Sequence, residues 1–510
     1  MVSSVTDEQN AAEDPRFQEE SFTEEKEWSF DDALTIIGFG RVQYQLVLIC
    51  ALILISTLNE TMGMMILMTP AQCDLELTSF DKGLLTSSGY FGIMIPSYMW
   101  GYICDKYGRR KVMIRTLIAT SLMALCSSLA PTFYWFLFFR FWTGFFVSAS
   151  SGGMYPYLGE FNTLKHRPTV MAWCSCGTGI SMTLAPAVAW YILSLDINIL
   201  LYGQLVFHSW RLILIVYTLP GLIAALLLTF FPESPKFLIS QGLEKETLEV
   251  LNWIHKTNTG DSRNYPVKRL AREIDADRLN NDVSEIQNIL NQTKQLLKPP
   301  FVKHFLIAIY IQTSIFISSG GMGLWFPEIL NQLYYSNTTG TICSIFKKNL
   351  HQGSNTLISN KECNNILSSE AFVNSIIVGL YYTFGYIIIS VLMKYCGRGL
   401  ILELSLLGSS VSGFLLQWTT NLSLQIIYFS SFLVLSGLMI SVISSAAVML
   451  FPTHVRAMAV CCILMIARIG TSLGSSLIGL TIEKYCEETF GFITSLIVVS
   501  AFLNFFLPAR

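Results

Sequence analysis

The chain has 510 residues, of which 52% are hydrophobic and only 13% are charged. A soluble protein carries roughly a quarter charged residues, so this composition excludes an ordinary cytosolic enzyme and indicates a membrane protein. The 33 basic and 35 acidic residues leave a net charge of -2, which argues against a nucleic-acid partner because such a partner selects a basic surface.

The first 35 residues differ in composition from the rest of the chain. Acidic side chains greatly outnumber basic ones there, and little apolar surface is available to bury. The composition predicts a disordered acidic cytoplasmic tail over residues 1–35. The tail also lacks the basic start and apolar stretch of a cleavable signal peptide, so we expect the first membrane segment to serve as the signal.

Twelve apolar stretches follow, each close to the roughly 20 residues that a helix needs to cross a bilayer. Polar residues or Gly and Pro separate them. The third and fourth stretches are divided only by a short break at Pro131, but together they are too long for one crossing. The predicted spans are 43–68, 83–103, 112–130, 133–155, 168–193, 210–231, 301–326, 371–393, 399–418, 423–450, 456–480 and 489–507.

Basic residues in the short loops predict the orientation, because cytoplasmic loops are enriched in Lys and Arg. They gather between spans 2 and 3, 4 and 5, and 8 and 9, and after span 10, which all lie on one side. The N-terminus and the linker 232–300 share that side, and so does the C-terminus after an even number of crossings. Both termini are therefore expected in the cytoplasm. Within the linker, residues 244–254 have the pattern of an amphipathic helix that lies against the cytoplasmic face.

Four cysteines fall on the opposite side of this topology: Cys73, Cys343, Cys363 and Cys486. Four cysteines allow three pairings, and the alternative is four free thiols. We favour a disulfide between Cys343 and Cys363, which share the outside loop 327–370. The sequon at Asn337 in the same loop is the expected glycosylation site. No cluster at metal-ligand spacing occurs, so neither a metal nor a cofactor is expected.

The loop after span 2 is repeated after span 8. Gly101, Asp105 and Gly108 of the first copy precede Arg109 and Arg110, and Gly397 with Arg398 follows at an offset of 289 residues. Such a repeat indicates two six-helix bundles, over 36–231 and 301–507. Gly101 would let two helices approach closely, Gly108 would permit a tight turn, and Asp105 could pair with neighbouring basic residues.

These residues resemble a known family. The Gly101–Arg110 motif, Arg140-Phe-Trp-Thr-Gly144 in span 4 and the twelve spans resemble the major facilitator superfamily. The segments 207–211, 232–237 and 324–328 resemble more narrowly the branch of synaptic vesicle glycoprotein 2 and related proteins, near the organic-ion transporters. The resemblance implies two bundles that rock about a midplane site, lined mainly by spans 1, 4, 7 and 10.

The second half departs from the family pattern. Lys394 and Met449 stand where the family has acids, so Arg398 and Arg456 would lack their usual partners. The resemblance then implies an inner gate held chiefly by the first half. Its candidate ion pairs are Asp105 with Arg167, and Glu160 with Arg109 or Arg110. The alternative is that these charges only occupy solvated helix ends, where each pair contributes about 0–1 kcal/mol.

Three charged residues lie deep inside predicted spans, where a charge is costly and therefore a functional candidate. By resemblance Arg140 is linked to proton coupling, and the alternative is that it binds neighbouring carbonyl groups. Arg468 stands where related transporters carry a basic residue, which favours a substrate or counter-charge role. Glu60 could accept a proton, bind a cation or pair with Arg468. The weaker candidates for substrate binding are Asn59, Trp190, Gln312, Asn374 and Ser444.

The sequence lacks a phosphate-binding loop, a nucleophile elbow and paired catalytic acids, so it predicts neither an ATP-driven pump nor an enzyme. We predict a secondary active transporter of small organic ions or polar metabolites, in the plasma membrane or a vesicle membrane. Its expected partners are the lipid bilayer, an organic solute for which an anion is one candidate, and a coupling proton. The expected oligomeric state is a monomer. The alternative is a transporter-like membrane binding protein that no longer cycles.

Overall fold

The computed structural model describes residues 27–507 apart from 196, 201–205, 261–264, 271–295, 300, 336–339, 348–366 and 452. Within these ranges the chain is almost entirely helical, and a short hairpin of β1 (Asn198–Leu200) and β2 (Val206–His208) is the exception. The predicted all-α fold is confirmed. The side chains of Lys394, Met449 and Arg456 lie outside the described part of the chain.

Six helical passes make up the first half of the molecule, and two of them are interrupted. The first pass changes helix at Gly63, and the second is broken at Pro96, which cannot supply a backbone donor inside a helix. The passes are α2 (Arg41–Met62) with α3 (Met64–Ala71), α4 (Ser79–Met94) with α5 (Ser97–Tyr107), α6 (Arg109–Ser128), α7 (Phe133–Glu160), α8 (Arg167–Leu193) and α9 (Ser209–Thr229).

The second half repeats this arrangement, and its first pass is irregular, as is the first pass of the first half. That pass leaves α-helical geometry in a π-helical turn, η2, and a 3₁₀ turn, η3, before it resumes as α14. The passes are α13 (Phe301–Ile315) with η2 (Phe316–Gly321), η3 (Gly323–Trp325) and α14 (Phe326–Tyr335), then α16 (Ser369–Tyr395), α17 (Arg398–Trp418), α18 (Leu422–Leu450), α19 (Thr453–Thr481) and α20 (Cys486–Asn504).

Ten helices in the described residues are long and apolar enough to cross a membrane. The α4–α5 pass is not among them, because the break at Pro96 leaves pieces of 16 and 11 residues. The α7 pass is not among the ten either, because Arg140 and the Trp, Ser and Gly residues of this helix lower its mean hydropathy. Both passes nevertheless pack among the other helices, so the predicted twelve passes are all present as helices in the structure.

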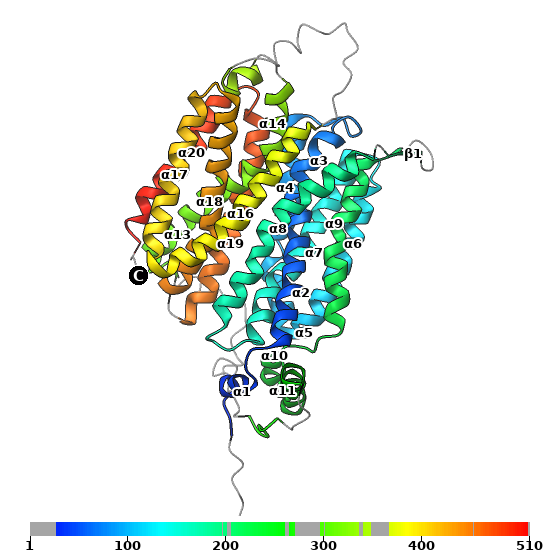
Figure 1. Ribbon diagram of the computed structural model, residues 1–510, viewed down its shortest axis with the longest axis vertical. Helices are drawn as coiled ribbons and strands as arrows, with labels where there is room; N and C mark the ends of the chain where they lie inside the picture. The colour runs from blue at the N-terminus through cyan, green and yellow to red at the C-terminus, as the bar shows by residue number, and fades with distance from the viewer. Residues whose placement is uncertain are drawn as a thin grey trace, which may run out of the picture.

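Figure 1 shows the two halves side by side, the first in blue to green and the second in yellow-green to red. Across their boundary α8 packs against α16 and α4 packs against α19. α3 and α14 lie at one end of the molecule, and α1 (Phe30–Ile37), α10 (Pro235–Ser240) and α11 (Glu244–Thr259) lie at the other. We call these the α3–α14 end and the α10–α11 end.

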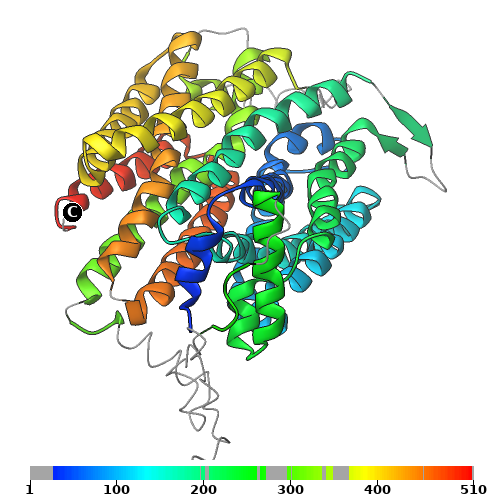
Figure 2. The same cartoon turned by 60° about the horizontal axis from the view of Figure 1, so that its bottom comes forward.

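A small helical cap covers the first bundle at the α10–α11 end. Figure 2 shows α1 beside α11 there. The Tyr265 hydroxyl donates to the Ala33 carbonyl at 2.6 Å, and the Asn258 side chain accepts from the Val42 amide at 2.9 Å. Apolar residues of α1 and α11 belong to the same buried cluster as those of α2 and α7. The amphipathic helix expected at 244–254 is thus α11, and its apolar face is buried against the first bundle.

Two glycines bring α4 and α7 into direct backbone contact. A Cβ at Gly92 would collide with the Phe141 carbonyl oxygen, and one at Gly144 would collide with that of Gly89. Close approach between small residues is a common source of helix association in membranes, where the hydrophobic effect does not drive packing. Gly101 does not share this role, because a Cβ there would meet no atom within 4 Å, and the expected close approach at Gly101 is wrong.

We expect Gly92→Ala to destabilise the protein by about 1–3 kcal/mol, the usual cost of overpacking a tight core. Gly101→Ala is the matched control, since it adds the same methyl group to a helix where space is free. Melting temperatures of the two variants in detergent check this expectation. Equal melting temperatures would show that the α4–α7 contact relaxes at no cost.

The disulfide prediction needs correction. Cys343 is bonded to Cys486 at the start of α20, with a Cα–Cα distance of 5.4 Å, and not to Cys363. The bond joins the connection between α14 and α16 to the last helix, 143 residues away in sequence. Cys73 is also disulfide-bonded. Cys363 and the predicted glycosylation site Asn337 lie outside the described residues.

Candidate functional site

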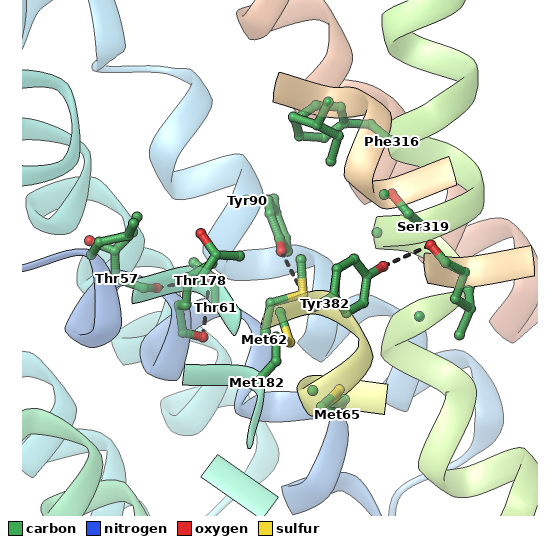
Figure 3. A pocket seen from close by; sticks show the side chains of 18 of the residues that line it. Thr57, Thr61, Met62, Met65, Tyr90, Thr178, Met182, Phe316, Ser319 and Tyr382 are labelled. Atoms are coloured by element: carbon green, nitrogen blue, oxygen red, sulfur yellow. Dashed lines mark hydrogen bonds between the residues drawn. The ribbon is translucent and has the colours of Figure 1, made fainter. Parts of the chain in front are cut away.

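A cavity of about 270 Å³ lies between the two bundles. Its walls come from α2, α3, α4, α7 and α8 of the first half, and from η2, η3, α14, α16, α18 and α19 of the second. In Figure 3, Thr57, Thr61 and Met62 of the first bundle lie opposite Phe316, Ser319 and Tyr382 of the second. The π-helical turn η2 forms part of the wall, as irregular helix turns often do at functional sites.

Arg468 of α19 is the predicted site residue that lines this cavity, and among the described residues it is the charged one in the wall. The remaining walls are mostly methionine, aromatic and aliphatic side chains with scattered hydroxyl groups. The cavity therefore joins an apolar surface to one cationic group.

The other predicted site residues lie outside the lining and connect helices to one another. The Ser181 hydroxyl donates to the Asn59 side chain at 2.9 Å, which joins α8 to α2. Gln312 of α13 donates to the Ser444 hydroxyl of α18 at 3.3 Å. Asn374 donates to the Tyr334 hydroxyl at 2.9 Å. Trp190 stacks on Phe372 across the boundary between the bundles, with ring centroids 6.1 Å apart.

Glu60 pairs with Arg140 and not with Arg468. An Arg140 Nη atom lies 2.5 Å from the Glu60 carboxylate and also donates to the Glu60 backbone carbonyl at 3.0 Å. Both side chains are only 2% exposed. The second carboxylate oxygen of Glu60 has no hydrogen-bond partner among the described residues. Arg140 thus binds a neighbouring carbonyl group, as the alternative weighed from the sequence predicts, and also a buried acid. Its role in proton coupling stays a prediction.

Sequence reasoning missed most of the cavity wall, notably Tyr90, Tyr155, Tyr382 and Tyr386. Each lies in an apolar helix where an aromatic residue is more often part of the core, so the sequence offers no signal that separates the two cases. The Tyr382 hydroxyl donates to the Leu433 carbonyl at 2.7 Å. Tyr90 donates to the Met62 sulfur at 3.2 Å, as the dashed line in Figure 3 marks.

The ion pairs expected at the inner gate are partly present at the α10–α11 end. Gly108 adopts a φ of 96°, which glycine tolerates far better than other residues, so the expected tight turn is confirmed. Arg109 forms an ion pair with Glu160, as one of the candidate pairs proposed. Arg109 also donates to Asp105, which lies four residues earlier in the chain, at 3.1 Å. The expected pairing of Asp105 with Arg167 is therefore wrong.

Other residues of the first half add further contacts at this inner gate. Arg167 donates to the carbonyls of Gly159 and Asn162, and lies 3.7 Å from Asp31 of α1. Arg110 donates to the carbonyls of Leu228 and Thr229 at the end of α9. Its backbone amide donates to Glu233 at 2.9 Å, so this carboxylate caps the N-terminus of α6. Arg398 is half-buried in the first turn of α17.

The α3–α14 end is closed by polar contacts between the bundles. Lys82 of α4 pairs with Glu328 of α14 at 2.7 Å, and each side chain is 5% exposed. Thr69 of α3 also donates to Glu328, and Ser79 donates to Glu483. Further along the boundary Thr86 bonds to Ser475 and Ser87 to Ser476. These contacts hold the two bundles together at this end.

Two helical bundles around a central cavity, joined at one end by polar contacts, define the class of solute-transporter folds. A family model described as the Major Facilitator Superfamily matches residues 49–347, and the chain belongs to this superfamily. It is a family of membrane transporters and not of enzymes.

Among curated proteins the chain is similar to Synaptic vesicle glycoprotein 2A of Rattus norvegicus, with 25% identity over 331 residues, which cover 61% of this chain and 44% of that protein. It is 30% identical over 222 residues to Synaptic vesicle glycoprotein 2C of Homo sapiens, covering 43% of this chain and 30% of the relative. The match therefore spans less than half the length of these relatives.

Among solved structures the chain is similar to the xylose transporter XylE from E. coli in a partially occluded inward open conformation. The TM-score is 0.64 at 14% identity, and the alignment covers 92% of this chain and 100% of that one. At this identity the likeness shows the fold.

Proposed function

We propose that the protein is a secondary transporter that moves a small organic anion across a membrane by alternating access. The observation that carries this proposal is the cavity between the bundles, with Arg468 as the charged residue of its described wall and with polar contacts that join the bundles at the α3–α14 end. A cation in a mostly apolar pocket selects an anion with an apolar body. Rocking of one bundle against the other would expose the cavity to each side in turn.

Glu60 and Arg140 form the proton-coupling site in this proposal. Their ion pair is buried inside the first bundle, at the same helix, α2, that lines the cavity through Thr57 and Thr61. A proton that binds Glu60 would weaken the pair and change how α2 and α7 hold together. The domain bounds follow the same proposal, with residues 36–231 and 301–507 as the moving units and 232–300 as their linker.

Uptake into proteoliposomes tests transport directly. We expect purified protein to accumulate a labelled aromatic monocarboxylate, benzoate, when the lumen is alkaline and the outside acidic. Arg468→Ala should abolish accumulation at unchanged protein content, while Arg468→Lys should retain part of it because the charge remains. Benzoate that binds without accumulating would support the alternative of a non-cycling binding protein, and full uptake by Arg468→Ala would remove Arg468 from the site.

Glu60→Gln should separate coupling from movement. Glutamine resembles protonated glutamate in shape and can still accept from Arg140, but it cannot release a proton. We expect net uptake driven by a pH gradient to fall at least tenfold, while exchange of internal for external benzoate continues. Parallel measurement of the two processes checks this. Equal loss of both would assign Glu60 to the structure of the bundle and not to coupling.

The basic loops at the α10–α11 end lead us to propose that this end faces the cytoplasm. The acidic and apolar cap of α1 and α11 would then lie inside the cell. Epitope tags after Gly260 and after Glu76 test this orientation in intact cells. We expect antibodies to reach only the second tag before permeabilisation, and the reverse would invert the topology.

A further inference from the structure

Helix α6 carries two exposed cations on the face that it turns away from the rest of the protein. The helix packs against α5, α7 and α9, and Figure 1 shows it on the side of the first half away from the second half. Lys111 and Arg115, one helical turn apart, are exposed, and so are Ile118 and Leu122 further along the same stripe. The outer face of α6 is therefore basic near the α10–α11 end and apolar beyond it.

Arg115 stands too far along α6 to lie wholly in water. The helix has 20 residues, and at about 1.5 Å per residue it is about 30 Å long, the thickness of the hydrocarbon core. Arg115 follows the first residue of the helix by about 9 Å along the axis. A charge at this depth on a lipid-facing helix is rare, and its long side chain reaches back to the interface. Side chains of an α-helix point toward its N-terminus, so Arg115 extends toward Lys111.

No counter-charge for these two cations lies in the part of the chain that the structure describes. Neither Lys111 nor Arg115 forms an ion pair or a side-chain hydrogen bond with a described residue. The carboxylates that contact the start of α6 bond elsewhere. Asp105 accepts from Arg109, and Glu233 accepts from two backbone amides in the first turn of α6. The two cations at the membrane surface are thus available to a partner from outside the chain.

The second half shows that the fold does not require cations at these positions. The repeat offset of 289 residues aligns α6 with α17, and both helices begin at the arginine that follows the shared glycine. The residues of α17 that correspond to Lys111 and Arg115 are Leu400 and Leu404, and both leucines are exposed. The next positions of this face are apolar and exposed in both helices. The fold accepts leucine at both positions, which leaves binding as the role of the cations.

We propose that Lys111 and Arg115 bind the headgroup of an anionic phospholipid from the leaflet at the α10–α11 end, with an acyl chain along Ile118 and Leu122. The phosphate accepts charge-assisted hydrogen bonds from both cations, and an arginine can bind it through two nitrogen atoms. A headgroup of net negative charge fits better than a zwitterionic one, because two positive side chains repel the cation of choline. Anionic lipids are enriched in the cytoplasmic leaflet, which this end is proposed to face.

Binding of short-chain lipids to the purified protein in detergent, measured by native mass spectrometry, tests this site. We expect the wild-type protein to bind dioctanoyl phosphatidylglycerol more tightly than dioctanoyl phosphatidylcholine. Lys111→Leu/Arg115→Leu, which copies α17, should weaken phosphatidylglycerol binding by about 30-fold, because each cation beside an anionic lipid contributes a factor of about five. Each single variant should lose about fivefold, and phosphatidylcholine binding should change by less than about threefold.

Lys245→Gln/Lys256→Gln is the matched control, because it removes the same charge from exposed positions of α11, outside the predicted spans. It should bind both lipids as the wild-type protein does. Unchanged phosphatidylglycerol binding in Lys111→Leu/Arg115→Leu, an equal loss of phosphatidylcholine binding in that variant, or an equal loss in the control would overturn the site. Glycerol 3-phosphate that displaces the lipid at equal concentration would also overturn it, since the acyl chain would then contribute nothing.

Discussion

Replacing Glu328 with glutamine should open the α3–α14 end of the protein. Lys82 and Glu328 form a buried ion pair across the two bundles, and each side chain is 5% exposed. Removing one charge leaves the other buried without a partner, which costs about 3–5 kcal/mol. Separation of the bundles at this end lets water reach Lys82 and removes the cost, so the equilibrium should shift toward the open state by about 100-fold or more.

Labelling of a cysteine in the cavity wall measures this shift. Ser319→Cys, in a background whose free cysteines are serine, should react with a membrane-impermeant maleimide much faster from the α3–α14 side when Glu328→Gln is present. Glu487→Gln is the matched control, because its partner Lys347 and Glu487 itself are 51% and 63% exposed. An exposed pair contributes about 0–1 kcal/mol, so the control should change labelling by less than about fivefold. Equal labelling rates in both variants would contradict a gate at Glu328.

Replacing Arg140 with leucine should destabilise the first bundle in a pH-dependent way. Glu60 would remain 2% exposed without its cation, at a cost of about 3–5 kcal/mol while it is ionised. A proton can replace the lost cation by neutralising the carboxylate, so the loss should be largest at pH 8 and smaller at pH 5. Relative to wild type, the variant therefore gains stability as the pH falls. Thermal unfolding in detergent at the two pH values measures the difference.

The double variant Glu60→Gln/Arg140→Leu separates charge from packing. It removes both charges of the pair, so its stability relative to wild type should not recover on acidification, and at pH 8 it should exceed that of the single variant. Identical unfolding of the single and double variants at every pH would show that Arg140 acts through packing and its bond to the Glu60 carbonyl.

The helices could be predicted from the sequence because the bilayer fixes their length and apolar composition. Every predicted span corresponds to a helical pass, and the positions of Gly63 and Pro96 account for two of the interruptions. The π-helical turn at Phe316–Gly321 could not be anticipated, since its residues satisfy an α-helical pattern equally well. The disulfide prediction was wrong because it paired two cysteines that are close in sequence, whereas the fold places Cys343 next to Cys486.

The candidate site was harder to predict, and the reason is physical. Inside a membrane a polar side chain must find a protein partner, because no water is present to satisfy it. Asn59 and Gln312 are therefore as readily explained by bonds to Ser181 and Ser444 as by a ligand. Spacing also could not decide whether Glu60 faces Arg140 or Arg468. Tyr90 and Met62 line the cavity but have the same sequence pattern as core residues.

Distances between spin labels at the two ends test alternating access most directly. One pair joins Glu76→Cys to Glu487→Cys at the α3–α14 end, and the other joins Lys111→Cys to Tyr395→Cys at the α10–α11 end, all at exposed positions. Alternating access predicts that benzoate at pH 5, compared with no ligand at pH 8, lengthens one distance while it shortens the other. Distances that stay fixed, or that change in the same direction at both ends, would contradict rocking of the two bundles about the cavity.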